Sequence, residues 1–136
     1  MENCIFCKIV KGGLPCSKLY EDESTLAFLD IKPVSDGHAL VISKDHYEDI
    51  FDVPEIVLCQ ISSTLKKVSE AVMKGVDAHG ISIGQSNKKS AGQIVPHIHF
   101  HIMPRFDDDG LKLWPQHDYE EGRIEEVQKK IKEHLQ

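Results

Sequence analysis

Histidine alternates with large apolar residues in the stretch His97-Ile98-His99-Phe100-His101. Successive side chains of a β-strand point to opposite faces of a sheet, so this period of two predicts a strand. We expect the strand to cover Ile94–Met103, with the histidines on one face and the apolar residues toward the core. Three imidazoles in a row pack poorly and need polar partners, so the strand also marks a candidate functional site.

Apolar runs and turn-forming residues indicate the other secondary structure elements. One helix begins at the capping box Asp52-Val53-Pro54-Glu55 and ends near Gly75, because apolar residues recur there at spacings of three and four. A second, C-terminal helix is expected from Ile124 to Leu135. Further strands are expected over Thr25–Asp30, His38–Ser43 and Ile81–Gly84. The order β–β–α–β–β–α predicts an α+β fold, a mostly antiparallel β-sheet packed with two helices.

Length and charge limit the classes of protein to consider. A chain of 136 residues suffices for one domain with a hydrophobic core. Its net charge of −6 argues against a nucleic-acid partner, which needs a basic face, although local dipoles can still hold one phosphate. No apolar run approaches the roughly 18 residues of a membrane helix, and nothing near the N-terminus resembles a signal peptide. We therefore expect no membrane partner, a cytoplasmic or nuclear location and reduced cysteines.

The histidine face suits chemistry on phosphorus. Imidazole, with an unperturbed pKa of about 6.5, is mostly neutral at pH 7 and can therefore act as a nucleophile. Two other interpretations are an exposed polar face that happens to use histidine, and a metal site built from this strand alone. The second is disfavoured because alternate residues lie about 6.6 Å apart along a strand, which separates the outer rings.

The segment from His97 to Met103 fits the signature His-φ-His-φ-His-φ-φ, where φ is apolar, of the histidine-triad (HIT) superfamily. Phe28–Pro33 resembles the segment that holds the nucleoside in this family, and Gly37–Ile42 resembles the strand that follows it. From Cys4 to about Trp114 the chain resembles the histidine triad nucleotide-binding (Hint) branch. This resemblance implies a single HIT domain over residues 1–136, with a core of about 4–114 and a helical extension of about 120–136.

The resemblance also implies a two-fold homodimer and a role for each histidine. Trp114-Pro115 resembles the C-terminal region that, in the Hint branch, reaches toward the active site of the partner. The middle histidine, here His99, would attack the α-phosphorus and form a nucleotidyl-histidine intermediate that water resolves. His101 would bind the phosphate oxygens, and His38 would assist electrostatically. On its own, His38 could equally be a surface histidine at a strand end.

The same resemblance assigns the nucleotide pocket. Asp30 would accept hydrogen bonds from both ribose hydroxyls, whereas without the resemblance it is a turn-forming aspartate. Phe28 and Ile31 would flank the base, although core packing explains such apolar residues equally well. The loop around the α-phosphate would include three residues, Asn87, Gly92 and Gln93.

One position departs from the family pattern. Many members have serine or threonine directly after the glutamine, whereas this chain has Ile94. That hydroxyl is thought to touch the phosphate or the leaving group. Its absence predicts weaker assistance to the leaving group, and therefore a lower rate or a shifted substrate preference within the same class of reaction.

The four residues Cys4-Ile5-Phe6-Cys7 form a C-x-x-C motif near the N-terminus. A redox pair is disfavoured because no strand–motif–helix context surrounds it, and two free thiols remain an alternative. In some histidine-triad proteins this pair joins two histidines in a zinc site. The matching ligands here are Cys4, Cys7, His46 and His97, and four such ligands would make a closed structural site. Cys59, on the long amphipathic helix, is expected to be packed.

The resemblance thus predicts a hydrolase of purine nucleoside phosphoramidates, such as adenosine 5′-monophosphoramidate. One alternative keeps the same attack but takes dinucleoside polyphosphates. A second alternative is a nucleotide-binding regulatory protein with little turnover, which Ile94 favours. A third is a purely structural zinc protein with no affinity for nucleotides. The bound partner in the favoured interpretation is a purine nucleotide of the AMP or GMP type, and no organic cofactor is expected.

Overall fold

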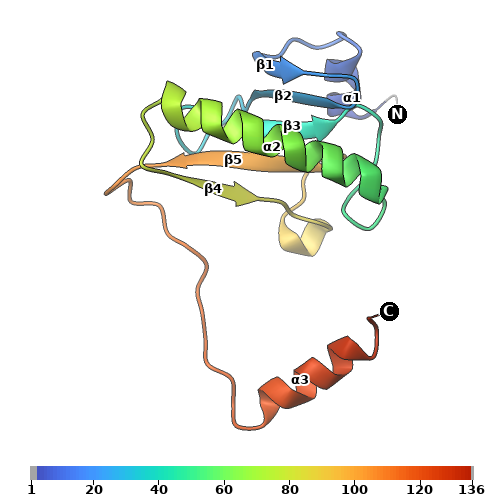
Figure 1. The fold of residues 1–136 in the computed structure, drawn as a ribbon, viewed down its shortest axis with the longest axis vertical. Helices are drawn as coiled ribbons and strands as arrows, with labels where there is room; N and C mark the ends of the chain where they lie inside the picture. The colour runs from blue at the N-terminus through green and yellow to red at the C-terminus, as the bar shows by residue number, and fades with distance from the viewer. Residues whose placement is uncertain (1–2, 136) are drawn as a thin grey trace.

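The computed structural model describes residues 3–135, and its centre is a five-stranded antiparallel sheet (Figure 1). The strand order is β1-β2-β3-β5-β4. The middle strand is almost entirely apolar and buried on both faces, as its sequence Ala-Leu-Val-Ile-Ser requires. The predicted α+β fold with a mostly antiparallel sheet is confirmed. The strands are β1 (Lys18–Glu21), β2 (Thr25–Leu29), β3 (Ala39–Ser43), β4 (Gly80–Gly84) and β5 (His99–Arg105).

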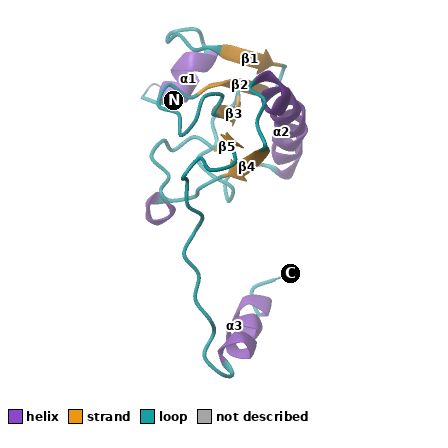
Figure 2. Ribbon diagram, turned by 90° about the vertical axis from the view of Figure 1, so that its left-hand side faces the viewer, coloured by secondary structure: helices purple, strands orange, loops and turns teal. Residues whose placement is uncertain are grey.

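Two helices cover opposite faces of this sheet (Figure 2). The long helix α2 (Glu55–Gly75) buries the stripe Ile61, Leu65, Val68 and Val72 against one face. The short helix α1 (Ile5–Val10) lies over the other face. Alternate residues of the strands therefore belong to two separate hydrophobic clusters, one under each helix.

The cluster under α1 contains the residues that pair with the histidine strand. Leu40 and Ile42 of β3 lie in this cluster, whereas Val41 faces α2. In the register of β3 and β5, Leu40 pairs with His101 and Ile42 pairs with His99. The histidines therefore share the α1 side of the sheet, opposite the long helix.

Three local predictions were wrong. The histidine strand begins at His99 and not at Ile94, because residues 94–98 form a loop in which the Ile98 N–H donates to the Tyr47 carbonyl (2.7 Å). The cap of α2 is Pro54, and the Asp52 carboxylate instead accepts from the Glu48 N–H (2.8 Å), so no capping box forms. Cys59 is exposed on α2 and is not packed.

Three short elements, α1, β1 and the 3₁₀ turn η1 (Lys89–Ala91), were not predicted, and the predicted C-terminal helix lies apart from the sheet. Helix α1 and strand β1 are six and four residues long, too short for a periodic pattern to identify them. The predicted C-terminal helix is present as α3 (Arg123–Lys132), but none of its residues is buried. It lies well away from the sheet in both views, at the end of the segment 106–122 (Figures 1 and 2). The turn η1 precedes β5.

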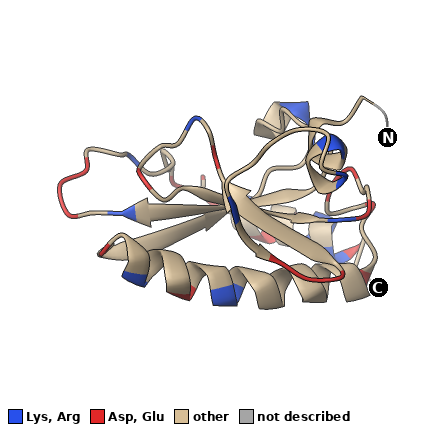
Figure 3. Ribbon diagram, turned by 90° about the horizontal axis from the view of Figure 1, so that it is seen from above, with Lys and Arg blue, Asp and Glu red and all other residues tan. Residues whose placement is uncertain are grey.

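Charged residues of both signs are distributed over the surface. Lysines and acidic residues alternate along α2, and the loops are mainly acidic in the view from above (Figure 3). Within residues 3–135, every helix is too short or too polar to cross a lipid bilayer.

The packing of α2 predicts that truncating a side chain of this helix lowers the stability of the protein only where that side chain is buried. Ile61 is fully buried and Ile56 is 67% exposed. Ile61→Ala should therefore lower the free energy of unfolding by about 2–5 kcal/mol, because it removes buried methyl groups and leaves a cavity. Ile56→Ala, the matched control, should change it by less than about 0.5 kcal/mol. Urea denaturation measures both, and equal losses for the two variants would contradict the packing described here.

Candidate active site

His99 is held in a defined tautomer by the backbone beside it. Its Nδ1 lies 2.7 Å from the carbonyl oxygen of His97. A carbonyl only accepts, so Nδ1 carries the proton and donates it. Nε2 therefore carries no proton, and its lone pair is free. This is the arrangement that an imidazole nucleophile needs, because the attacking nitrogen must present its lone pair to the substrate.

His38 and His101 form a hydrogen-bonded pair next to it. The Val34 N–H donates to His38 Nδ1 (3.1 Å), so this nitrogen is an acceptor and the proton of His38 sits on Nε2. His38 Nε2–H in turn donates to His101 Nδ1 (2.9 Å). That leaves the proton of His101 on its own Nε2. The backbone amide of Val34 thus fixes the tautomers of two successive rings and makes His101 a donor.

Asp30 lies at the edge of this pair. One of its carboxylate oxygens is 3.7 Å from His38 Nε2, and the other accepts from the Lys32 N–H (2.9 Å). Its own N–H donates to the carbonyl of His38 (2.9 Å), which ties the end of β2 to the start of β3. The carboxylate is half-buried and therefore accessible to a ligand.

The fold keeps His38, His99 and His101 neutral at pH 7. Burial lowers the pKa of His99 and of His38, while Asp30 opposes the shift. For His101, burial together with the charges that His99 and His38 would carry lowers the pKa to about 4. Neutral rings are what the hydrogen-bond chain requires, since a protonated ring could not accept.

Phe6 is a residue of the site that sequence reasoning missed. Its ring packs edge-on against His99 and against Phe28, with centroid distances of 5.1 Å and 5.7 Å. Phe28 is buried in the same cluster, whereas Ile31 is 91% exposed. Phe28 therefore acts as a wall behind the histidines, and Ile31 is free to contact a ligand. The only available signal for Phe6 was its position inside the C-x-x-C motif.

The loop that contains the predicted phosphate-binding residues is held by its own side chains. The Asn87 carbonyl oxygen accepts from the Ile50 N–H (2.8 Å), and the Gln93 oxygen accepts from the Lys88 N–H (2.8 Å). Gly92 has φ of +95°, a conformation that favours glycine. The amides of Asn87 and Gln93 thus shape the loop and are not bonded to the histidines; their contact with phosphate stays a prediction.

Lys88 is bound to an acidic residue that the sequence did not single out. Its Nζ lies 2.6 Å from the carboxylate of Asp49, which is almost fully buried. This ion pair fastens the loop to the segment before α2. Ile94, where many family members have a hydroxyl, is 92% exposed. It offers no hydrogen-bond donor to a leaving group.

The four predicted metal ligands form one cluster beside His99. Cys4 Sγ is 3.4 Å from His97 Nδ1, and Cys7 Sγ is 3.3 Å from His46 Nδ1 and 3.6 Å from His97 Nδ1. Zinc bonds of about 2.3 Å to sulfur and about 2.0 Å to nitrogen in a tetrahedron place such ligand atoms about 3.5 Å apart. The ligand atoms of all four residues lie within 4.8 Å of one another, so the spacing fits this ion.

His97 is oriented for that role by a second hydrogen bond. Its Nε2 lies 2.7 Å from the carbonyl of Ser43 and donates to it, so Nδ1 is the nitrogen that faces the sulfurs. Burial lowers the pKa of His97 to about 4, which keeps the ring in the neutral form that binds metals.

The antiparallel sheet carries the ring of His99, whose Nε2 is unprotonated, beside the hydrogen-bonded pair of His38 and His101. This arrangement matches a histidine-triad domain. The family model described as the HIT domain matches residues 11–108 of this chain. The chain therefore belongs to the HIT family.

Relatives and solved structures agree with this assignment. The chain is 48% identical over 107 residues to an uncharacterized HIT-like protein of Methanocaldococcus jannaschii, covering 79% of this chain and 82% of that protein. It is 41% identical to adenosine 5′-monophosphoramidase hnt1 of Schizosaccharomyces pombe, over 96% of this chain and 99% of the other.

Two crystal structures have the same fold. The structure of SMU.412c from Streptococcus mutans has a TM-score of 0.94 at 36% identity and covers 100% of this chain and 87% of that one. A zinc-bound histidine triad family protein from Mycobacterium smegmatis has a TM-score of 0.78 at 35% identity, over 98% and 99% of the two chains.

The lowered pKa of His101 predicts a loss of stability in mild acid. In the unfolded chain a histidine binds its proton with a pKa of about 6.5, whereas folded His101 does so only at about 4. The unfolded state therefore binds more protons between these values, and the stability falls as the pH is lowered from 6.5 toward 4. Between pH 7 and pH 5 His101 should account for up to about 2 kcal/mol of this loss.

Urea denaturation at pH 7 and at pH 5 measures this loss of stability. His101→Asn should reduce the difference between pH 7 and pH 5, whereas His117→Asn, at an exposed histidine, should leave it unchanged. If the difference in stability between pH 7 and pH 5 were the same in His101→Asn, burial would not be what keeps the His101 ring neutral.

Proposed function

We propose that this HIT protein hydrolyses purine nucleoside phosphoramidates through a covalent nucleotidyl intermediate on His99. The single observation that supports this most strongly is the hydrogen bond from His99 Nδ1 to the carbonyl of His97, which leaves Nε2 as an unprotonated nucleophile. Relatives named adenosine 5′-monophosphoramidase, such as the protein from Schizosaccharomyces pombe, favour a nucleotide with a P–N bond as the substrate.

In the first step, His99 Nε2 attacks the α-phosphorus as the P–N bond to the leaving amine breaks. His101, whose proton sits on Nε2, donates a hydrogen bond to a phosphate oxygen and offsets the negative charge that develops there. His38 holds His101 in this tautomer. Because Ile94 has no hydroxyl, the leaving amine takes its proton from solvent.

In the second step, water attacks the same phosphorus and the bond to His99 Nε2 breaks. The nucleoside monophosphate leaves, the proton of the water passes to solvent, and His99 returns to its neutral form. Two displacements replace one difficult attack by water.

The nucleoside would occupy the side of the sheet that faces α1. Asp30 would accept hydrogen bonds from the ribose hydroxyls, and Phe28 and Ile31 would flank the base. Backbone N–H groups around Gly92, shaped by Asn87 and Gln93, would surround the α-phosphate.

Ile94 favours a second candidate, a nucleotide-binding regulatory protein with little turnover. Its exposed sec-butyl side chain cannot protonate an amine, so chemistry could be slow even with an intact nucleophile. A dinucleoside polyphosphate remains the alternative substrate, because the same attack on an α-phosphorus would release a nucleotide.

Replacing the nucleophile separates these candidates. His99→Ala should lower kcat for adenosine 5′-monophosphoramidate by at least about 10⁴-fold, because the covalent route is lost. Binding of AMP, measured by calorimetry, should persist. His117→Ala, at an exposed histidine, is the matched control and should leave kcat unchanged.

A substrate panel on the unaltered protein completes the test. Faster turnover of the phosphoramidate than of diadenosine polyphosphates supports the proposal. Retention of turnover in His99→Ala would refute it, and nucleotide binding without measurable turnover of any substrate would favour the regulatory candidate.

We further propose that Cys4, Cys7, His46 and His97 hold a structural zinc ion. Their donor set and spacing match tetrahedral zinc, and a relative from Mycobacterium smegmatis is described as zinc-bound. With all four positions filled by protein, the ion would have no open site for substrate. It would fasten α1, and with it Phe6, against the histidine strand.

Metal analysis tests the zinc site. Protein from metal-replete expression should contain about one zinc per chain, and Cys7→Ser should lose the metal and unfold at lower urea concentration. Cys59→Ser, at an exposed cysteine, should keep both properties. Less than half an equivalent of zinc in the unaltered protein would contradict the site.

Two further expectations follow from this proposal. Zinc-bound thiolates need a reducing compartment, which favours the cytoplasm or nucleus. The homodimer stays a prediction, and the exposed apolar residues of the C-terminal segment, such as Trp114 at 86%, support it.

A further inference from the structure

Lys88 has a backbone conformation that lysine rarely adopts. Its φ is +72° and its ψ is 159°, a combination used almost only by glycine. The residue lies directly before η1 in the loop of residues 87–93, which we call the phosphate loop because its backbone would surround the α-phosphate. Strain of this kind persists only where the surrounding contacts hold the backbone in place. The contacts of Lys88 therefore bear on the function of the loop.

Two contacts hold Lys88 in this conformation. Its N–H donates to the side-chain oxygen of Gln93 across the loop (2.8 Å), and its Nζ lies 2.6 Å from the carboxylate of Asp49. The Asp49 side chain is only 1% exposed, and its other oxygen accepts from the Phe51 N–H (3.0 Å). The Lys88 side chain is 60% exposed. A ligand can therefore reach the cation of this pair, whereas the anion is buried and fixed.

A hollow of about 440 Å³ adjoins the phosphate loop. Its lining includes Lys88, Lys89 and Gly92 of the loop, the exposed Ile94, and Glu48 from the segment before α2. Gly92 belongs both to this hollow and to the part of the loop that would hold the α-phosphate. In a substrate with a chain of phosphates, the phosphates beyond the first would therefore extend into the hollow.

The charges around the hollow leave a small negative excess. Glu48, Asp49 and Asp52 provide three carboxylates, whereas Lys88 and Lys89 provide two ammonium groups. Asp49 raises the pKa of Lys88, and the charges of Glu48 and Asp52 act in the same direction, so all three carboxylates lie near this ammonium. A single ionised phosphate can be held by backbone N–H groups of the loop. Each further ionised phosphate would meet a region with no net positive charge.

We propose that Asp49 sets the substrate specificity of the phosphate loop, a role that rests on the function proposed above. By neutralising Lys88, Asp49 favours substrates whose only ionised phosphate is the one attacked, such as a nucleoside phosphoramidate. It disfavours substrates with a chain of further phosphates, such as a dinucleoside polyphosphate. Because Asp49 is buried, it does not touch the substrate and is a positioning residue that acts through Lys88.

Asp49→Asn tests this role with almost no change of shape. The variant keeps an oxygen that can accept from the Phe51 N–H, but it leaves Lys88 as an unneutralised cation. The ratio of kcat/KM for diadenosine tetraphosphate to that for adenosine 5′-monophosphoramidate should rise at least about fivefold. The rise should come from a lower KM for the polyphosphate and should disappear in concentrated salt. Glu70→Gln, at an exposed position of α2, loses the same charge and should leave the ratio unchanged.

Lys88→Gly should move the same ratio in the opposite direction. Glycine adopts a φ of +72° without strain, so the phosphate loop keeps its shape while Asp49 loses its counter-charge. The ratio should fall at least about threefold below that of the unaltered protein. The double variant Asp49→Asn/Lys88→Gly lacks both charges and should return to within about twofold of the unaltered protein.

Three results would overturn the proposal. One is an unchanged ratio in Asp49→Asn, and another is a rise that persists in the double variant, because the Lys88 cation would not be its cause. The third is an equal loss of activity on both substrates in every variant, which is what a purely structural ion pair predicts. If urea denaturation shows that Asp49→Asn is unfolded, Lys88→Gly decides, and an unchanged ratio there refutes the role of the pair.

Binding measurements separate the role of Asp49 from the proposed function. Calorimetry with AMP and with ATP, without added divalent metal, requires no turnover. The affinity for ATP relative to AMP should rise at least about fivefold in Asp49→Asn and should fall in Lys88→Gly. These shifts in a protein that turned over neither substrate would support the role of Asp49 and refute the proposed function. Equal changes for AMP and ATP in an active enzyme would refute the role of Asp49 alone.

Discussion

The hydrogen bond from His99 Nδ1 to the carbonyl of His97 joins the two halves of the site. Through its backbone, His97 orients the ring of His99; through its ring, it takes part in the cluster with Cys4 and Cys7. Its Nε2 is held in turn by the carbonyl of Ser43 at the end of β3. One residue therefore couples the packing of the N-terminal segment, the register of the central strands and the tautomer on which the proposed chemistry depends. A change that moves the cluster should also move the ring of His99.

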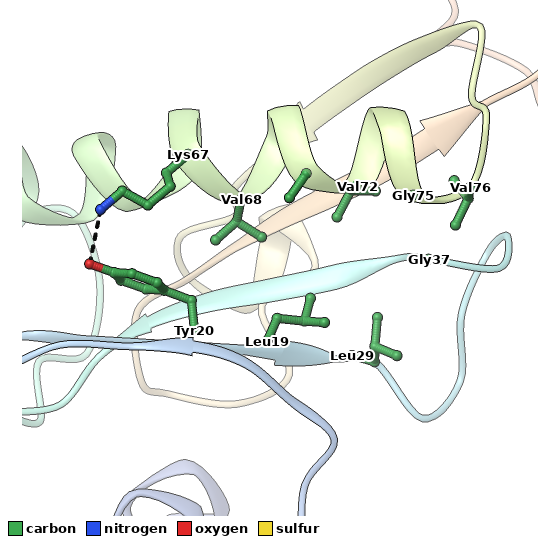
Figure 4. A pocket seen from close by; sticks show the side chains of 10 residues that line it. Leu19, Tyr20, Leu29, Gly37, Lys67, Val68, Val72, Gly75 and Val76 are labelled. Carbon is green, nitrogen blue, oxygen red and sulfur yellow. Dashed lines mark hydrogen bonds between the residues drawn. The ribbon is translucent and has the colours of Figure 1, made fainter.

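Burial supplies the second requirement of the site. The hydrogen-bond chain from Val34 through His38 to His101 works only if both rings are neutral, and burial lowers their pKa values accordingly. The fold achieves this by placing the histidines on the α1 face, over Leu40 and Ile42, where Phe6 and Phe28 exclude water. The side of the sheet under α2 carries the larger core, and an apolar hollow lies there between α2 and the strands β1 and β2 (Figure 4).

Long, periodic patterns were predictable from the sequence, whereas features that depend on contacts between distant residues were not. The stripe of α2, the buried strands β2 and β3 and the alternating histidines were enough to predict the fold class. The start of β5 was wrong because the ring of His97 is drawn into the cysteine cluster and Pro96 cannot donate to a ladder. The grouping of the four candidate metal ligands followed from the family resemblance. The tautomers, the wall formed by Phe6 and the ion pair of Lys88 with Asp49 each depend on backbone positions that no local pattern encodes.

The central claim is that His99 itself forms a bond to phosphorus, and the stereochemistry at phosphorus tests it most directly. A nucleoside phosphoramidate made chiral at the α-phosphorus with sulfur can be hydrolysed by the protein in ¹⁸O-labelled water. Two successive in-line displacements, first by His99 and then by water, each invert the centre and so give overall retention of configuration. Retention is the result that the account predicts. Inversion would show a single direct attack by water and would contradict it.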